Sequence, residues 1–247
     1  MGRLARDSRR SDPAQQGFDI SPTPLRRVVT RGSVRVNGWF ASRKMQACIP
    51  WESSNEKAFL IRAELDTTVR RIYAQAVRLA VSTDEGIWNH VPDFVVVTDR
   101  GIEVHEVKTD AEADDARMRT RLAFAARRVR LHGALYSVDR ESALKAQPVY
   151  GVVLALHRRL HDRVPQDLTD LAIGAAQDAG CLTAERLATV TARRGGSLEA
   201  VYALVAQGVL RMDLSAPFGP GARVWPPGSF PCEPRMIPLD VPSEPSR

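Results

Sequence analysis

The sequence predicts an α/β protein: a core with a mixed sheet flanked by helices, followed by a C-terminal winged-helix-like helical module. Two observations predict this class. Between residues 33 and 162, short β-branched runs with turn signals alternate with helical apolar periodicity. After residue 163, three helical stretches separated by glycines precede two short strand-like segments. With 247 residues, the chain can build one substantial core or two smaller ones.

The N-terminal segment differs in composition from the rest of the chain. Residues 1–32 are rich in Arg, Ser, Pro and Gln, which predicts a mostly flexible arm. Residues 1–46 hold ten Arg and Lys against three Asp and Glu, whereas the remainder holds 25 basic and 26 acidic residues. The net charge of +6 is therefore concentrated near the N-terminus. Such an arm either attracts nucleic-acid phosphates or serves only as a solubilising tail.

Turn and cap signals define the opening elements of the core. Alternating residues around the pair Asn37-Gly38 predict a β-hairpin over residues 34–40, because Asn-Gly pairs favour tight hairpin turns. Ser53 is a typical helix N-cap, and Glu56 stands at the capping-box position. A helix is therefore expected to begin there and to end near Asp66.

The middle of the chain predicts strands that bring acidic residues together. Residues 69–81 are interpreted as two short strands or one bent strand. The runs 90–98 and 102–108, joined by a glycine turn, predict an antiparallel hairpin. In such a pair, the start of the first strand lies beside the end of the second. Asp93 and Glu106 are therefore expected to meet.

The remaining elements complete the core and form the second module. The expected helices span 111–131, 167–179, 183–192 and 197–206, and the runs 135–139 and 149–156 can supply further strands. Residues 208–214 are expected to form a turn that leads into a strand, and residues 218–225 a Gly/Pro turn with a second strand. This order divides the chain into a flexible basic arm (1–32), a core domain (33–162), a winged-helix-like domain (163–225) and a proline-rich tail (226–247), which is expected to be extended or disordered.

The composition argues against a membrane or secreted protein. No stretch approaches the roughly 20 apolar residues of a membrane span. The N-terminal arginines are not followed by the apolar core of a secretory signal. Cys48, Cys181 and Cys232 match neither a zinc-binding spacing nor a disulfide framework, which is typical of a reducing compartment. A cytoplasmic protein is therefore expected.

Phosphodiester hydrolysis needs an activated water and neutralisation of the phosphate charge. The acidic residues at the strand ends can supply both by binding a divalent metal ion. Asp93 and Glu106 are carboxylates of the kind that hold Mg²⁺, with Mn²⁺ as a substitute, and the backbone carbonyl of Val107 is a candidate third ligand. Lys108 shares a strand face with Glu106 and can position the attacking water or offset developing charge. Glu56, on the early helix, is a fourth acidic group that can join the metal or its water.

Each of these residues also has a purely structural interpretation. An acid after a proline is common turn chemistry, and Glu56 can be only a helix cap. His90 can contact a phosphate or merely close a turn, and alternation turns His105 away from the Glu106 face. The ordered combination of Glu56, Asp93, Glu106 and Lys108 nevertheless favours a metal-dependent nuclease.

This order of motifs resembles the PD-(D/E)xK nuclease superfamily, and the flanking residues resemble the TnsA family, endonuclease subunits of heteromeric bacterial transposases. The resemblance is carried by residues 38–45, residues 51–56, Val69 with Gln75, residues 90–94 and residues 106–108. It covers about residues 33–140 and is compatible over 166–225, where that family carries a winged-helix-like domain. The arginine-rich arm does not map onto the family.

The resemblance implies a restriction-endonuclease-like core, with Glu56, Asp93, Glu106 and Lys108 at the four active-site positions. Some members carry Gln where this chain carries Glu106. It further implies cleavage of double-stranded DNA at transposon ends beside a DDE-type transposase subunit. The C-terminal module would then bind DNA or an ATP-dependent regulator. The alternatives are a restriction or repair nuclease with the same core, and a non-catalytic DNA-binding or assembly protein.

Overall fold

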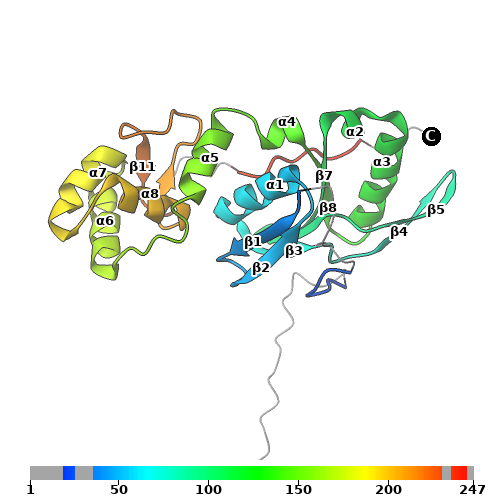
Figure 1. The fold of residues 1–247 in the computed structure, drawn as a ribbon, viewed down its shortest axis with the longest axis horizontal. Coiled ribbons are helices and arrows are strands. Elements are labelled where there is room, and N and C mark those ends of the chain that lie inside the picture. The colour runs from blue at the N-terminus through cyan, green and yellow to red at the C-terminus, as the bar shows by residue number, and fades with distance from the viewer. Residues whose placement is uncertain (1–18, 26–35, 230–234, 244–247) are drawn as a thin grey trace, which may run out of the picture.

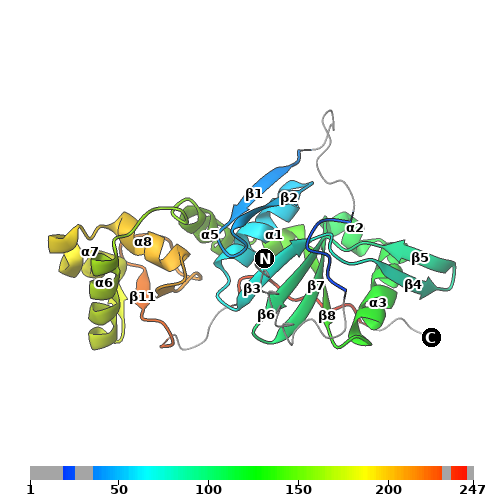
Figure 2. The same ribbon diagram turned by 90° about the horizontal axis from the view of Figure 1, so that it is seen from below.

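A four-stranded mixed sheet in the order β3-β6-β7-β8 forms the centre of the larger part of the protein, as the computed structural model in Figures 1 and 2 shows. β3, β6 and β7 are antiparallel, whereas β7 and β8 are parallel. The structure describes residues 19–25, 36–229 and 235–243. The predicted α/β class, with a mixed sheet flanked by helices, is confirmed.

Within the described ranges, the elements follow one another along the chain as strands, helices and a short 3₁₀ turn. They are β1 (Gly38–Ser42), β2 (Ala47–Trp51), α1 (Ser54–Leu65), β3 (Val69–Ala74), β4 (Leu79–Thr83), β5 (Gly86–His90), β6 (Phe94–Thr98), β7 (Gly101–Lys108), α2 (Asp110–Asp114), α3 (Ala116–Arg130), β8 (Leu135–Arg140), α4 (Glu141–Leu144), α5 (Val149–His157), α6 (Gln166–Ala179), β9 (Leu182–Thr183), α7 (Ala184–Thr191), the 3₁₀ turn Ala192–Arg194, α8 (Leu198–Ala206), β10 (Arg211–Met212) and β11 (Arg223–Trp225).

Two helices cover the two faces of the sheet. α1 packs on one face, where Phe59 stacks on Phe94 with ring centroids 4.8 Å apart. α3 packs on the other, where Leu122 joins the core formed by Val95 and Val104. Successive residues of β6 therefore enter different cores, which explains why this strand is a continuous β-branched run rather than an alternating one.

The predicted hairpin turn at Asn37-Gly38 is wrong, and residues 34 and 35 of that prediction lie outside the described residues. Gly38 opens β1, and the chain turns back only between β1 and β2. A Cβ atom on Gly38 would lie 2.6 Å from the Trp51 ring, so glycine is needed here for close packing rather than for a turn. The actual turn is held by the buried Glu64 of α1, whose carboxylate accepts the backbone N–H groups of Arg43 and Lys44.

Two other predicted elements differ from the structure. The apolar run 149–156 forms helix α5 rather than a strand, because a short buried run has no periodicity that separates the two. The single helix expected over 111–131 is broken at Asp115. This residue ends α2, and its side chain caps α3 by accepting the Met118 N–H at 2.7 Å.

The smaller part of the protein contains α6, α7, α8 and a three-stranded sheet in the order β10-β11-β9. α8 packs against α5 of the core, as both views show. The described part of the proline-rich tail, here called the C-terminal strap (residues 235–243), then returns to the large sheet. The Val138 N–H donates to the Asp240 carbonyl at 2.9 Å, which covers the open edge of β8.

The N-terminal region is described only in part. Of the predicted basic arm, residues 19–25 are described, and the remainder lies outside the described residues. Ser21 and Leu25 donate their backbone N–H groups to the carbonyls of Ala76 and Gln75. Within the described ranges, no helix is both long and apolar enough to cross a bilayer.

Candidate active site

All four predicted site residues line one cavity at the end of the large sheet. Asp93 comes directly before β6, Glu106 and Lys108 stand at the end of β7, and Glu56 lies in the first turn of α1. The cavity has a volume of about 790 Å³, and Val107 also lines it. Because β6 and β7 are antiparallel, the start of one lies beside the end of the other.

Asp93 is a buried acid that is held by the neighbouring strand. Its Oδ2 accepts the backbone N–H of Val107 at 2.9 Å. Burial raises the pKa of Asp93 well above its ordinary value, and the nearby carboxylates of Glu106 and Glu56 raise it further. The three acids are therefore close enough to repel one another, and a cation placed among them would relieve this repulsion.

Glu106 is paired with the lysine two residues along the same strand. Its Oε1 accepts a hydrogen bond from Lys108 Nζ at 2.5 Å, and its Oε2 lies 3.3 Å from His90 Nε2. Burial raises the pKa of Glu106, but the contacts with His90 and Lys108 outweigh it, so the pKa lies below its ordinary value. Burial lowers the pKa of Lys108, but the negative charges of Glu106 and Asp93 outweigh burial and raise this pKa above its ordinary value. Lys108 is therefore a cation at neutral pH.

His90 and Tyr136 belong to this site in space. His90 is at the end of β5, and its Nε2 lies 2.9 Å from the Tyr136 hydroxyl. Trp88 stacks on the His90 ring with centroids 4.2 Å apart. His90 thus braces Glu106 rather than only closing a turn. Tyr136, on β8, was not expected here, because nothing in its local sequence indicates which face of a distant strand it occupies.

Glu56 acts as part of the cap of α1. Ser53 Oγ accepts the Glu56 N–H at 3.1 Å, which confirms the predicted N-cap. The Glu56 carboxylate accepts the Glu52 N–H at 2.8 Å and the Ser53 hydroxyl at 3.2 Å. The cap interpretation of Glu56 is therefore correct. Its charge also raises the pKa of Asp93, so the same carboxylate contributes to the electrostatics of the cavity.

The donor set has the chemistry of a site for a hard divalent cation. It consists of carboxylate and carbonyl oxygens. Among the described residues, two buried amide oxygens at or beside this cavity, Asn55 Oδ1 and Gln75 Oε1, have no hydrogen-bond donor, and Glu106 Oε2 has only the contact with His90 at 3.3 Å. Acceptors without donors suit a cation. Among the residues that the structure describes, however, no three His, Cys, Asp or Glu side chains form a group that could hold a metal ion.

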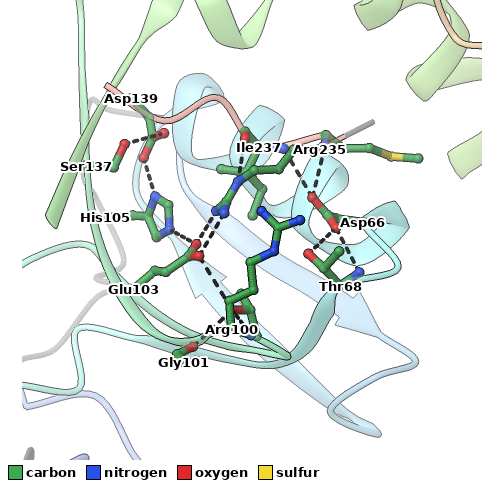
Figure 3. A network of polar contacts seen from close by, with 12 residues as sticks. Asp66, Thr68, Arg100, Gly101, Glu103, His105, Ser137, Asp139, Arg235 and Ile237 are labelled. Carbon is green, nitrogen blue, oxygen red and sulfur yellow. Dashed lines mark hydrogen bonds and ion pairs between the residues drawn. The ribbon is translucent and has the colours of Figure 1, made fainter. Parts of the chain in front are cut away.

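The opposite face of β7 carries a second buried polar group, which Figure 3 shows. His105 Nδ1 lies 2.8 Å from Asp139, and its Nε2 lies 3.3 Å from Glu103, which also pairs with Arg235 of the C-terminal strap. Burial lowers the pKa of His105, but Asp139 and Glu103 outweigh it and raise the pKa to about 9. His105 faces away from Glu106, as alternation predicted. This group fastens the strap and is separate from the cavity.

Comparison with known protein families and curated proteins found no relative of this chain. No family model matches the sequence, and no curated protein matches it significantly.

Proposed function

We propose that the protein is a metal-dependent endonuclease that hydrolyses phosphodiester bonds in double-stranded DNA. The observation that carries this proposal is the shared cavity of Asp93, Glu106, Lys108 and Glu56, at the adjoining ends of two antiparallel strands and a helix. The acids repel one another, and buried acceptor oxygens beside them lack donors. The order of elements is that expected of a restriction-endonuclease-like core.

Asp93, Glu106, Glu56 and the Val107 carbonyl are the groups that would hold Mg²⁺ or Mn²⁺. When bound, such an ion would activate a water for attack and offset the charge of the phosphate. The Val107 N–H fixes the orientation of Asp93. His90 contacts the Glu106 carboxylate, and the Tyr136 hydroxyl in turn holds the His90 ring. Lys108 would position the attacking water or donate to the developing phosphate charge.

Within this class, we propose the more particular role of a TnsA-type subunit that cuts at transposon ends beside a DDE-type transposase. The helix-strand-helix-helix-strand-strand order of α6 to β11 supports a winged-helix-like module. Residues 201–206 of α8 are buried, and α8 carries no Lys or Arg. A module whose third helix is covered is better suited to binding a protein, such as an ATP-dependent regulator, than to reading DNA bases.

The test is nicking of supercoiled DNA by the purified protein, alone and together with a DDE-type transposase encoded beside it. We expect nicks with Mg²⁺ or Mn²⁺ only, and none with EDTA or with Asp93→Ala. Full activity in EDTA or in Asp93→Ala would refute the mechanism. Cleavage without any partner and without preference for transposon ends would favour the restriction or repair alternative. DNA binding without cleavage in either setting would favour the non-catalytic alternative.

A further inference from the structure

Gln75 has a backbone conformation that few non-glycine residues adopt. It follows β3 directly, with φ at +48°, in the left-handed region. Its N–H donates to the Asp93 carbonyl at 2.8 Å, and its own carbonyl accepts the Leu25 N–H at 3.0 Å. Such strained residues persist only where the surroundings hold them, and they gather at functional sites.

The Gln75 side chain is equally constrained. It is 1% exposed, and its Nε2 donates to Glu52 Oε2 at 3.2 Å. Its Oε1 is a buried acceptor without a donor in the described part of the chain. A residue chosen for packing alone would not keep both a strained backbone and an unsatisfied amide oxygen, because each costs free energy.

Glu52 continues the connection toward α1. It lines the active-site cavity, and its N–H donates to Glu56 Oε2 at 2.8 Å. Three hydrogen bonds therefore run from the Asp93 backbone through Gln75 and Glu52 to the Glu56 carboxylate. These bonds join the strand that carries one proposed metal ligand to the helix that carries another.

We propose that Gln75 and Glu52 are positioning residues that set the separation between Asp93 and Glu56, and so tune the affinity of the cavity for its divalent cation. This inference rests on the proposed function. Residues that orient metal ligands commonly change metal affinity or activity by about 10- to 100-fold when they are replaced.

Four variants separate this role from a merely structural one. Gln75→Asn keeps an amide that tolerates the left-handed backbone, but it is one methylene too short to reach Glu52. Glu52→Ala removes the acceptor, whereas Glu52→Gln keeps an acceptor oxygen for Gln75 and serves as the conservative rescue. Gln46 is the matched control, because it is the other non-glycine residue with positive φ in the described ranges and it lies in the exposed β1–β2 turn.

The measurement is Mn²⁺ binding by titration calorimetry on the full chain, followed by the Mg²⁺ concentration that half-saturates cleavage. We expect Gln75→Asn and Glu52→Ala to weaken Mn²⁺ binding about 10- to 100-fold, and Glu52→Gln and Gln46→Asn to bind like the wild type. The double variant Gln75→Asn with Glu52→Ala should be no worse than either single variant, since both break one connection.

The outcomes distinguish this inference from the proposed function. Unchanged Mn²⁺ affinity in Gln75→Asn and Glu52→Ala, in a protein that cuts DNA, would overturn the inference alone. Equal weakening in Gln46→Asn would also overturn it. If the wild type never cuts DNA but binds Mn²⁺ about 10- to 100-fold more tightly than Gln75→Asn and Glu52→Ala do, the nuclease is overturned and the connection is supported. A wild type that binds no divalent cation would overturn both. If Gln75→Asn does not fold, Glu52→Ala against Glu52→Gln still decides the matter.

Discussion

The backbone N–H of Val107 donates to the Asp93 carboxylate across 2.9 Å, so the end of one strand orients the acid that begins its neighbour. Neither residue is free to move alone, because Val107 is paired in the sheet and Asp93 is buried. The position of this carboxylate is therefore a property of the sheet register rather than of a flexible loop.

Replacing Asp93 by Asn should abolish cleavage and stabilise the metal-free protein. The pKa of Asp93 lies well above its ordinary value of 3.8, so its ionised form costs stability as the pH rises above about 4. Asn can still accept the Val107 N–H without that charge. We expect a gain of about 1 kcal/mol at pH 7, or roughly 2–4 °C in Tm, and none near pH 3. Calorimetry at both pH values checks this, and a lower Tm at pH 7 would contradict it.

Glu56→Gln separates the cap from a metal role. The amide oxygen can still accept a hydrogen bond at the start of α1, so the free energy of unfolding should change by less than about 1 kcal/mol. If Glu56 serves the cation, cleavage should fall at least tenfold. Parallel urea unfolding and nicking assays measure the two effects. Wild-type activity in Glu56→Gln would show that Glu56 serves only as part of the helix cap.

Arg235→Ala should destabilise the protein in a pH-dependent way. Burial raises the pKa of Glu103, but His105 and Arg235 outweigh it and lower the pKa to about 2. A lowered pKa means that this stabilisation is present above the ordinary value of 4.5 and is lost as the pH falls toward 2. We expect a cost of about 2 kcal/mol at pH 7, measured by urea unfolding, and a smaller cost at pH 3.

The control for that variant is Arg70→Ala. Arg70 also pairs with a carboxylate, that of Asp99, but the two side chains are 61% and 49% exposed. Such a surface pair contributes at most about 1 kcal/mol. Equal losses in the two variants would show that the attachment of the C-terminal strap adds nothing specific.

Neutralising the arginines at positions 26, 27, 31 and 35 with Gln should weaken DNA binding and flatten its salt dependence. Each phosphate contact contributes about 0.9 to the slope of log K against log salt, so the slope should fall by as much as about 3.6. Fluorescence anisotropy over a salt series measures it. Replacing Arg127, Arg128 and Arg130 is the control for charge lost elsewhere, and an unchanged slope in the first variant would show that these four arginines make no phosphate contact.

Local signals in the sequence were enough to predict part of this arrangement. Ser53 and Glu56 indicate a helix start within four residues, and the helix begins there. Asp93 and Glu106 could be expected to meet because one tight turn joins their strands. These predictions depend on neighbours in the chain, where turn and cap chemistry is specific.

Distant partners explain what could not be predicted. Gly38 looks like a turn residue until the Trp51 ring is placed against it. The run that forms α5 has the composition of a strand, and only its packing against α1 and α8 determines its conformation. The pairing of Arg235 with Glu103 and the bracing of His90 by Tyr136 join residues far apart in sequence, for which no local pattern exists.

The C-terminal strap also affects the order in which the chain can finish folding during synthesis. Arg62 donates to the Met236 carbonyl, and Asp66 accepts the Met236 N–H. Arg62 lies in α1 and Asp66 caps the end of that helix, yet their partner is made only after the whole second module. Domains commonly fold from the N-terminus as they leave the ribosome. Here a chain that has not yet reached Met236 leaves Arg62 and Asp66 without these bonds, so the cavity-bearing core is completed only after the C-terminal strap has been synthesised.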